Sequence, residues 1–144
     1  MNRRTRTHTL VHAEKEFLQR LEEKIVRSHS VLMLEEPHHA LVMMKMRETA
    51  RHHLFYLGEV LVSECRVRLN GSLGLGIIRG DRMEEARMLA VIDACFNADS
   101  PLISELENSI YEEMQRQKEQ RLRESAKVLV SRVHFETMEE EVKS

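Results

Sequence analysis

The sequence is poor in aromatic residues, glycine, proline and cysteine. Its 144 residues include four Phe, two Tyr, no Trp, five Gly, two Pro and two Cys. Cys65 and Cys95 form neither a disulfide framework nor a zinc-ligand spacing, and two cysteines alone cannot hold an iron–sulfur cluster. We therefore expect two buried thiols in a cytoplasmic protein.

Long apolar runs and an excess of charge of one sign are also absent. No apolar run reaches the roughly 18 residues that a membrane span requires, and no signal-peptide pattern opens the chain, so we expect neither a membrane span nor secretion. Lys and Arg number 22 against 24 Asp and Glu, a formal net charge of −2. This balance gives no case for nucleic-acid binding.

The sequence does contain enough apolar residues for a core, with 42% hydrophobic residues and nine Met. Its length predicts one domain over residues 1–144, with residues 1–9 and 139–144 as flexible tails. Residues 1–30 hold seven basic against four acidic side chains, and residues 135–144 hold four acidic against one basic. The two ends could attract each other, face different partners, or simply be solvated.

Hydrophobic periodicity predicts an α+β fold. Apolar residues in 10–27 recur at helical spacing. They alternate in 40–47 and 61–69, as in strands with one drier face, and Pro37 should separate an earlier short strand at 31–34. With the segment after residue 71, we expect an antiparallel sheet of about four strands.

Asn70-Gly71 is the strongest local signal. Between two strand-like runs it predicts a type I′ hairpin turn, because both positions need positive φ. The resulting register pairs Leu69 with Ser72 and places Gly74 and Gly76 opposite apolar residues of the preceding strand. One face would then admit a closely packed helix, and the other, which something should cover, carries three apolar residues: Leu73, Leu75 and Ile77.

The glycines also invite a phosphate-loop interpretation. A dinucleotide fingerprint needs glycine where Arg79 stands, and the glycines in a strand-to-helix turn. Gly74 and Gly76 lie inside a predicted strand, so close packing of a helix on that strand is the better account.

Two helices are predicted in the second half. Residues 82–97 follow Asp81 as an N-cap, with Glu84 in a capping box, and are so apolar around Asp93 that this helix should be buried. Ser100-Pro101 should start a long C-terminal helix that runs to about residue 130. Its two apolar stripes are separated by the polar residues 115–121, where the helix either crosses solvent, breaks, or meets a polar partner.

The residues that follow the second strand of the predicted hairpin are candidates for binding an anion. Arg79-Gly80-Asp81 combines a strand end, a flexible glycine and a helix N-terminus, an arrangement that can hold an anion; a plain turn with a cap is the alternative. Arg132 is a second candidate contact. Arg79, Arg132 and His134 are candidate partners for Asp93, which as a buried carboxylate must be paired.

The histidines and carboxylates show no metal-ligand set, so no metal site is predicted. His8 and His12 have helical metal-pair spacing without a third ligand. Adjacent histidines at 38–39 and 52–53 would point to opposite sheet faces, as would Glu59 and Glu64, which rules out a paired-carboxylate site. No complete catalytic set is evident.

Several ordered motifs carry a family resemblance. They are residues 55–65 (FYLGEVLVSEC), 69–71 (LNG), 74–81 (GLGIIRGD), 90–94 (AVIDA) and 131–138 (SRVHFETM). Across about residues 10–138 the chain resembles the PhnG family, a small subunit of the carbon–phosphorus lyase core complex. The resemblance implies a role in the use of phosphonates as a phosphorus source.

The resemblance further implies assembly with PhnH, PhnI and PhnJ subunits. That complex couples an alkylphosphonate to the ribose C1 of MgATP and displaces adenine, with nucleosidase chemistry ascribed to PhnI and radical cleavage to PhnJ. We therefore expect a scaffolding subunit of a transferase complex, without a cofactor of its own. The alternatives are a stand-alone homodimeric binding module, and a catalytic contributor whose Arg79 or Arg132 reaches the triphosphate.

Overall fold

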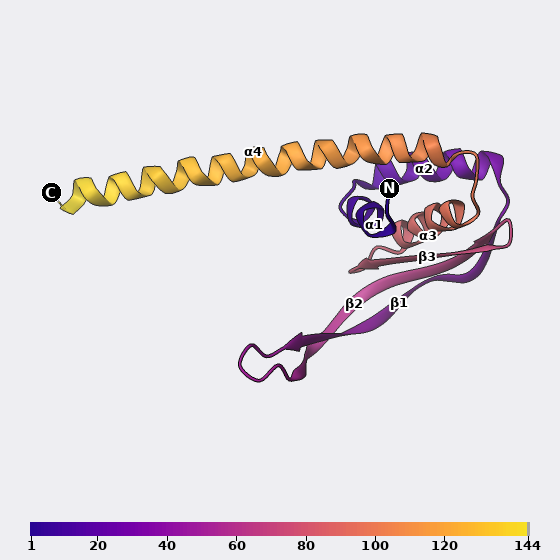
Figure 1. Ribbon diagram of the computed structural model, residues 1–144, viewed down its shortest axis with the longest axis horizontal. Helices are drawn as coiled ribbons and strands as arrows, with labels where there is room; N and C mark the ends of the chain where they lie inside the picture. The colour runs from indigo at the N-terminus through magenta and orange to yellow at the C-terminus, as the bar shows by residue number, and fades with distance from the viewer. Residues whose placement is uncertain (144) are drawn as a thin grey trace.

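The computed structural model describes the backbone of residues 1–143 and the side chains of residues 1–138. The α+β class is confirmed (Figure 1). In chain order the elements are α1 (Arg3–Val11), α2 (Lys15–Ser28), β1 (Val31–Arg47), β2 (Leu54–Leu69), β3 (Ser72–Arg79), α3 (Met83–Asn97) and α4 (Ile103–Lys143). Within residues 1–143, no helix is both long and apolar enough to cross a lipid bilayer.

The sheet is antiparallel, with strand order β1-β2-β3. The predicted turn is confirmed, since Asn70 and Gly71 have φ of 48° and 82°. The predicted register is confirmed as well: Leu69 pairs with Ser72, and Gly74 and Gly76 pair with Val67 and Cys65. The turn residues therefore determine which residues of β3 face the core.

The expectation of about four strands is wrong by one. Residues 31–34 and 40–47 belong to a single strand, β1, which pairs with β2 along its whole length. Pro37 lies at an irregularity, where the register shifts between Glu35 and His38. A bulge accommodates a residue that has no N–H to donate, so the proline bends the strand instead of ending it.

The helix α3 lies between the sheet and the layer formed by α2 and the first half of α4 (Figure 1). A Cβ on Gly74 would overlap Ala90 and Ala94, and one on Gly76 would overlap Ala86 and Ala90. The two glycines thus allow α3 to approach β3 closely, as the sequence predicts. The fully buried side chains around this contact include Leu18, Ile25, Val67, Leu69, Ile92 and Ile110.

The N-terminal segment is not the predicted flexible tail. Residues 3–11 form α1, in which Asn2 Oδ1 accepts a hydrogen bond from Thr5 N at 2.8 Å. The single helix expected over 10–27 is also wrong, because α2 begins only at Lys15. The chain turns between the two helices, so that α1 contacts α4 while α2 packs on α3.

The last helix begins near the predicted point and continues further. Ser100 Oγ accepts a hydrogen bond from Leu102 N at 3.2 Å, and the α-helix starts at Ile103. It runs without a break through the polar residues 115–121 to Lys143, well past the expected end near residue 130. The expected tail at 139–144 is therefore helical through Lys143, whereas Ser144 and the acidic side chains of 139–141 lie outside the described residues.

Candidate functional site

Two parts of the molecule project beyond the core. The strand β3 pairs with β2 only between Val62 and Leu69, so the rest of the sheet is a two-stranded arm made of residues 41–47 and 54–61. Figure 1 shows this arm extending away from the helices, and α4 extending past the core above it. We call these the β-arm and, for residues 118–138, the helical extension.

The β-arm has apolar side chains that nothing in the described chain covers. A two-stranded hairpin is marginally stable by itself in water, and exposed apolar clusters of this kind mark interaction sites. Its exposed large apolar residues are Leu41, Val42, Met43, Met44, Met46, Leu54, Phe55, Tyr56, Leu57 and Leu61.

The helical extension is similar. Gln117, which is 8% exposed, is the last buried side chain of α4 among the described residues. Its Nε2 donates to Thr9 O of α1 at 3.0 Å and so ends the contact of α4 with the core. Beyond it lie seven exposed large apolar residues: Leu122, Val128, Leu129, Val130, Val133, Phe135 and Met138.

The outer face of the core sheet is also uncovered. Leu73, Leu75 and Ile77 are 57%, 38% and 40% exposed, on the side of β3 away from α3. The sequence predicts that this face needs cover from another part of the chain or from a partner. Among the described residues, α1 borders this face at a hollow that Arg3, Arg6, Thr7 and Leu10 line together with Leu75 and Ile77, yet all three apolar side chains of β3 remain exposed.

Asp93 forms the buried ion pair that the sequence requires, but with different partners. Its carboxylate accepts from Arg3 at 2.7 Å and from Arg6 at 3.3 Å, both in α1. It also accepts from Leu75 N, at the free edge of β3, at 3.2 Å. The expected partners Arg79, Arg132 and His134 are not involved.

Arg6 is 7% exposed, and its guanidinium lies 4.0 Å from the centroid of the Phe96 ring. Burial lowers the pKa of Arg6, while Asp93 opposes that effect. Arg6 is thus buried where α1 meets α3, whereas Arg3 reaches Asp93 from the surface, with 63% of its side chain exposed. The Asp93 cluster is structural.

The four candidate anion contacts are not brought together. Arg79 ends β3 with an exposed side chain, whereas Arg132 lies in the helical extension, where its Nε is 3.6 Å from Glu136 Oε1. Gly80 has the expected positive φ of 89°. Any anion contact would therefore have to use one end of the molecule or the other.

The predicted cap at Asp81 is wrong. The N-cap of α3 is Arg82, and its N–H donates to Ser63 Oγ at 2.9 Å. Ser63 in turn donates to Gly80 O at 2.7 Å, so a buried strand serine holds the loop. The Asp81 carboxylate instead lies 2.8 Å from His39 Nε2, across the base of the β-arm. The start of α3 is therefore held by Ser63 from the neighbouring strand rather than by the Asp81 side chain.

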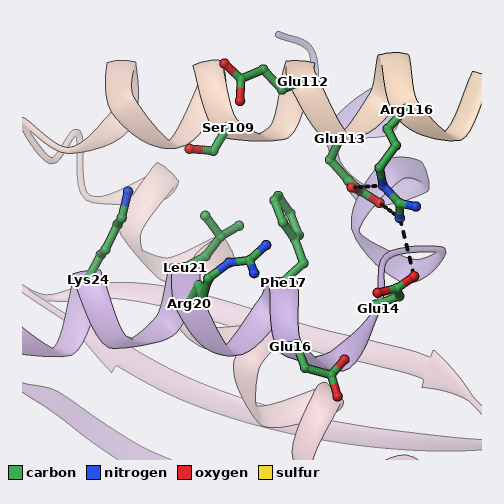
Figure 2. Close-up of a pocket in the computed structure, with 10 residues that line it drawn as sticks. All are labelled: Glu14, Glu16, Phe17, Arg20, Leu21, Lys24, Ser109, Glu112, Glu113 and Arg116. Atoms are coloured by element: carbon green, nitrogen blue, oxygen red, sulfur yellow. Dashed lines mark hydrogen bonds and ion pairs between the residues drawn. The ribbon is translucent and has the colours of Figure 1, made fainter.

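A groove of about 550 Å³ lies between α2 and α4 (Figure 2). Phe17 and Leu21 point into it from α2, and charged residues form its rims. Much of that charge is already paired, since Arg116 contacts Glu113 at 2.8 Å and Glu14 at 3.7 Å. Hydrogen bonds from Arg116 lower the pKa of Glu113. The groove therefore resembles a packing space between helices more than a ligand pocket.

One cluster was missed by the sequence reasoning. Ligand atoms of Glu35, His38 and Glu64 all lie within 4.8 Å of one another. The interpretation of His38-His39 as unable to chelate holds for that pair alone, because the other ligands come from the bulge and from the neighbouring strand. The proline at position 37, next to acidic and imidazole side chains, was the available signal, although the sequence predicts a strand break there rather than a bulge.

The sequence comparison identifies the family. Residues 1–140 of the 144-residue chain match the family model described as Phosphonate metabolism protein PhnG. The chain belongs to the PhnG family. No curated protein matches it in a direct sequence search. PhnG membership confirms the resemblance and assigns the chain to phosphonate metabolism.

Proposed function

We propose that this PhnG chain is an accessory subunit of a heteromeric transferase complex in the cytoplasm. The complex would couple an alkylphosphonate to the ribose C1 of MgATP with loss of adenine, and form a ribose 1-alkylphosphonate 5-triphosphate. PhnI-, PhnJ- and PhnH-type subunits would be its partners, and MgATP and the alkylphosphonate would be substrates of the complex.

The observation that carries this proposal is the shape of the molecule. Its core is compact, yet both the β-arm and the helical extension leave it with exposed apolar side chains (Figure 1). A monomeric protein rarely exposes so many contiguous apolar residues. Two projecting elements can wrap a partner and bury far more area than the core could.

The chemistry of the chain supports an accessory role. Among the described side chains, the three buried carboxylates are all held in ion pairs with arginines: Asp93 with Arg3 and Arg6, Glu22 with Arg87, and Glu113 with Arg116. The candidate arginines lie on different elements: Arg79 is the last residue of β3, and Arg132 lies in the helical extension, beyond the last buried side chain of α4 among the described residues. Catalysis is therefore better placed on the partner subunits.

Reconstitution tests the proposal. The untagged chain is co-expressed with affinity-tagged PhnI-, PhnJ- and PhnH-type subunits, and adenine release from ATP and methylphosphonate is measured. We expect the chain to co-purify and adenine release to require the complex. Turnover by this chain alone, or a stable homodimer that ignores the other subunits, would contradict the proposal.

Surface variants sharpen that test. Leu129→Asp with Val133→Asp, on the helical extension, should abolish co-purification. Arg123→Ala is the matched control, because Arg123 is an exposed polar residue of the same helix. Arg79→Ala and Arg132→Ala should leave both assembly and adenine release unchanged; a selective loss of adenine release would instead assign that arginine to the active site.

A further inference from the structure

We propose that Glu35, His38 and Glu64 form a binding site for a divalent transition-metal ion of the Zn²⁺ class. The site lies on the outer face of the sheet, at the bulge in β1, and it is independent of the proposed function. It has one imidazole nitrogen and two carboxylates as donors. Mixed nitrogen and oxygen donors of this kind suit such ions.

The backbone brings the three side chains together. His38 pairs across the strands with Glu64, so both side chains point to the same face. The register shift between Glu35 and His38 brings Glu35 onto that face as well, where Arg66 lies opposite it. Bulges often re-aim a side chain at a functional site.

The geometry of His38 matches that of a metal-binding histidine. Its Nδ1 lies 2.8 Å from Glu36 O, so Nδ1 carries the proton and donates to that carbonyl. Its Nε2 lies 2.8 Å from Glu64 Oε1 and donates a hydrogen bond to it in the metal-free chain, so a bound ion would replace that Nε2 proton, which is released to solvent. A metal-ligating histidine typically donates its other ring N–H to such an acceptor, which orients the ring and fixes the tautomer.

The three ligand atoms need to move little to reach the spacing that a tetrahedral metal requires. Donor atoms about 2.1 Å from a tetrahedral metal lie about 3.4 Å apart, and the three here already lie within 4.8 Å. Small rotations of the glutamate side chains would close that gap. Arg66 Nε lies 3.5 Å from Glu35 Oε2. This ion pair is long, so Glu35 could bind the metal either with the pair broken or with Arg66 still in contact with the carboxylate.

The proposed metal site lies at the base of the β-arm, where a bound ion would affect the stiffness of the arm. Glu64 pairs with Ile77 near the last residues that β3 shares with β2, so the metal would cross-link β1 and β2 where the three-stranded sheet becomes the β-arm. With three protein donors, one coordination position would remain for water or for a group from a partner. The bound ion would stiffen the base of the β-arm.

Calorimetric titration of the untagged, metal-stripped full chain with ZnCl₂ tests the site. We expect one Zn²⁺ per chain. His38→Asn and, separately, Glu64→Gln should each weaken binding at least about tenfold, with circular dichroism confirming that the variants are folded. His39→Asn is the matched control, since His39 contacts Asp81 and lies outside the cluster.

A second histidine pair provides the alternative to exclude. His8 and His12 have ring centroids 4.6 Å apart on α1. The variant His8→Asn with His12→Asn should bind Zn²⁺ as the parent chain does. Loss of binding in that variant, unchanged binding in His38→Asn, or no saturable binding by the parent chain would each overturn the proposal and leave His38 and Glu64 as an ordinary ion pair.

Discussion

Asp93 shows how one charge can be kept inside an otherwise apolar helix. Its carboxylate lies among two guanidinium groups, the Leu75 N–H and the amide of Asn97. Each buried polar atom thereby has a partner, which offsets the cost of removing the charge from water. The residue also closes part of the free edge of β3.

Replacement of Asp93 should therefore be costly. Asp93→Asn would leave the Arg6 guanidinium buried without a counter-charge, and we expect a loss of about 3 kcal/mol in the free energy of unfolding. Urea denaturation measures this loss. Asp81→Asn is the control, because the His39–Asp81 pair is exposed and should contribute less than about 1 kcal/mol. Equal costs for both would contradict the structural role of Asp93.

Gly74 gives a second prediction at this scale. A Cβ there would overlap Ala90 O and Ala94 Cβ of α3, so Gly74→Ala should destabilise the protein by about 2 kcal/mol through overpacking. Leu73→Ala, at the exposed neighbour, should cost well under that amount. Thermal unfolding of the two variants side by side tests the difference; a Gly74→Ala variant as stable as the parent would show that α3 can shift away.

The thiol of Cys65 should be unreactive in the folded protein. Burial raises its pKa to about 11, so almost no thiolate is present at pH 8, and alkylation needs the thiolate. Mass spectrometry should show slow iodoacetamide labelling of the folded chain and rapid labelling in guanidinium chloride. Labelling of the folded chain should accelerate as the pH rises toward 11. Rapid labelling of folded Cys65 at pH 8 would be the opposite outcome.

At the scale of elements, α4 has two parts with different roles. Leu106 and Ile110 are completely or almost completely buried, and they hold its first half on the core. From residue 118 onward the described side chains are exposed. Helical stability there rests on local hydrogen bonds and on pairs such as Arg132–Glu136.

A chain that ends at Gln120 should therefore fold as well as the full chain. It keeps Gln117 and its hydrogen bond to Thr9, so its melting temperature should change by less than about 3 °C. It should no longer co-purify with the partner subunits. Ile110→Ala, in the buried half, should by contrast cost about 3 kcal/mol. A large loss of stability on truncation would show that the extension packs on its own chain.

At the scale of the whole molecule, the apolar surface is concentrated away from the core. The β-arm, the helical extension and the outer face of the sheet carry most of the exposed large apolar residues. Charge is balanced over the chain, so little net repulsion keeps two copies apart. The molecule has the surface of one part of a larger assembly.

The isolated chain should consequently self-associate. Sedimentation velocity should show a mean mass that rises with concentration, because exposed apolar arms find each other when no partner is present. Leu41→Asp, on the β-arm, should reduce this association, and Glu59→Gln, a polar change on the same arm, should not. A monomer at all concentrations would contradict the proposed role of the arm.

Local signals predicted the local structure well. Asn70-Gly71 determined both the turn and the register, because positive φ at two positions allows one hairpin geometry. Pro37 was misleading, since a bulge can absorb a proline within a strand. Asp81 was misleading for the same kind of reason: a capping signal predicts a helix start only when no tertiary partner, here His39, takes the side chain.

The sequence by itself determined the α+β class and the hairpin. It also determined that Gly74 and Gly76 allow a helix to approach β3 closely, and that the buried Asp93 carboxylate needs a partner. Periodicity and turn chemistry are local rules, and the cost of burying a charge demands a partner for Asp93 without saying which residue supplies it. Only the tertiary structure decided that the partners of Asp93 come from the N-terminus, that Glu35 and His38 meet Glu64, and that the β-arm and the helical extension leave the core. Those outcomes depend on contacts between residues far apart in the chain, which no local pattern encodes.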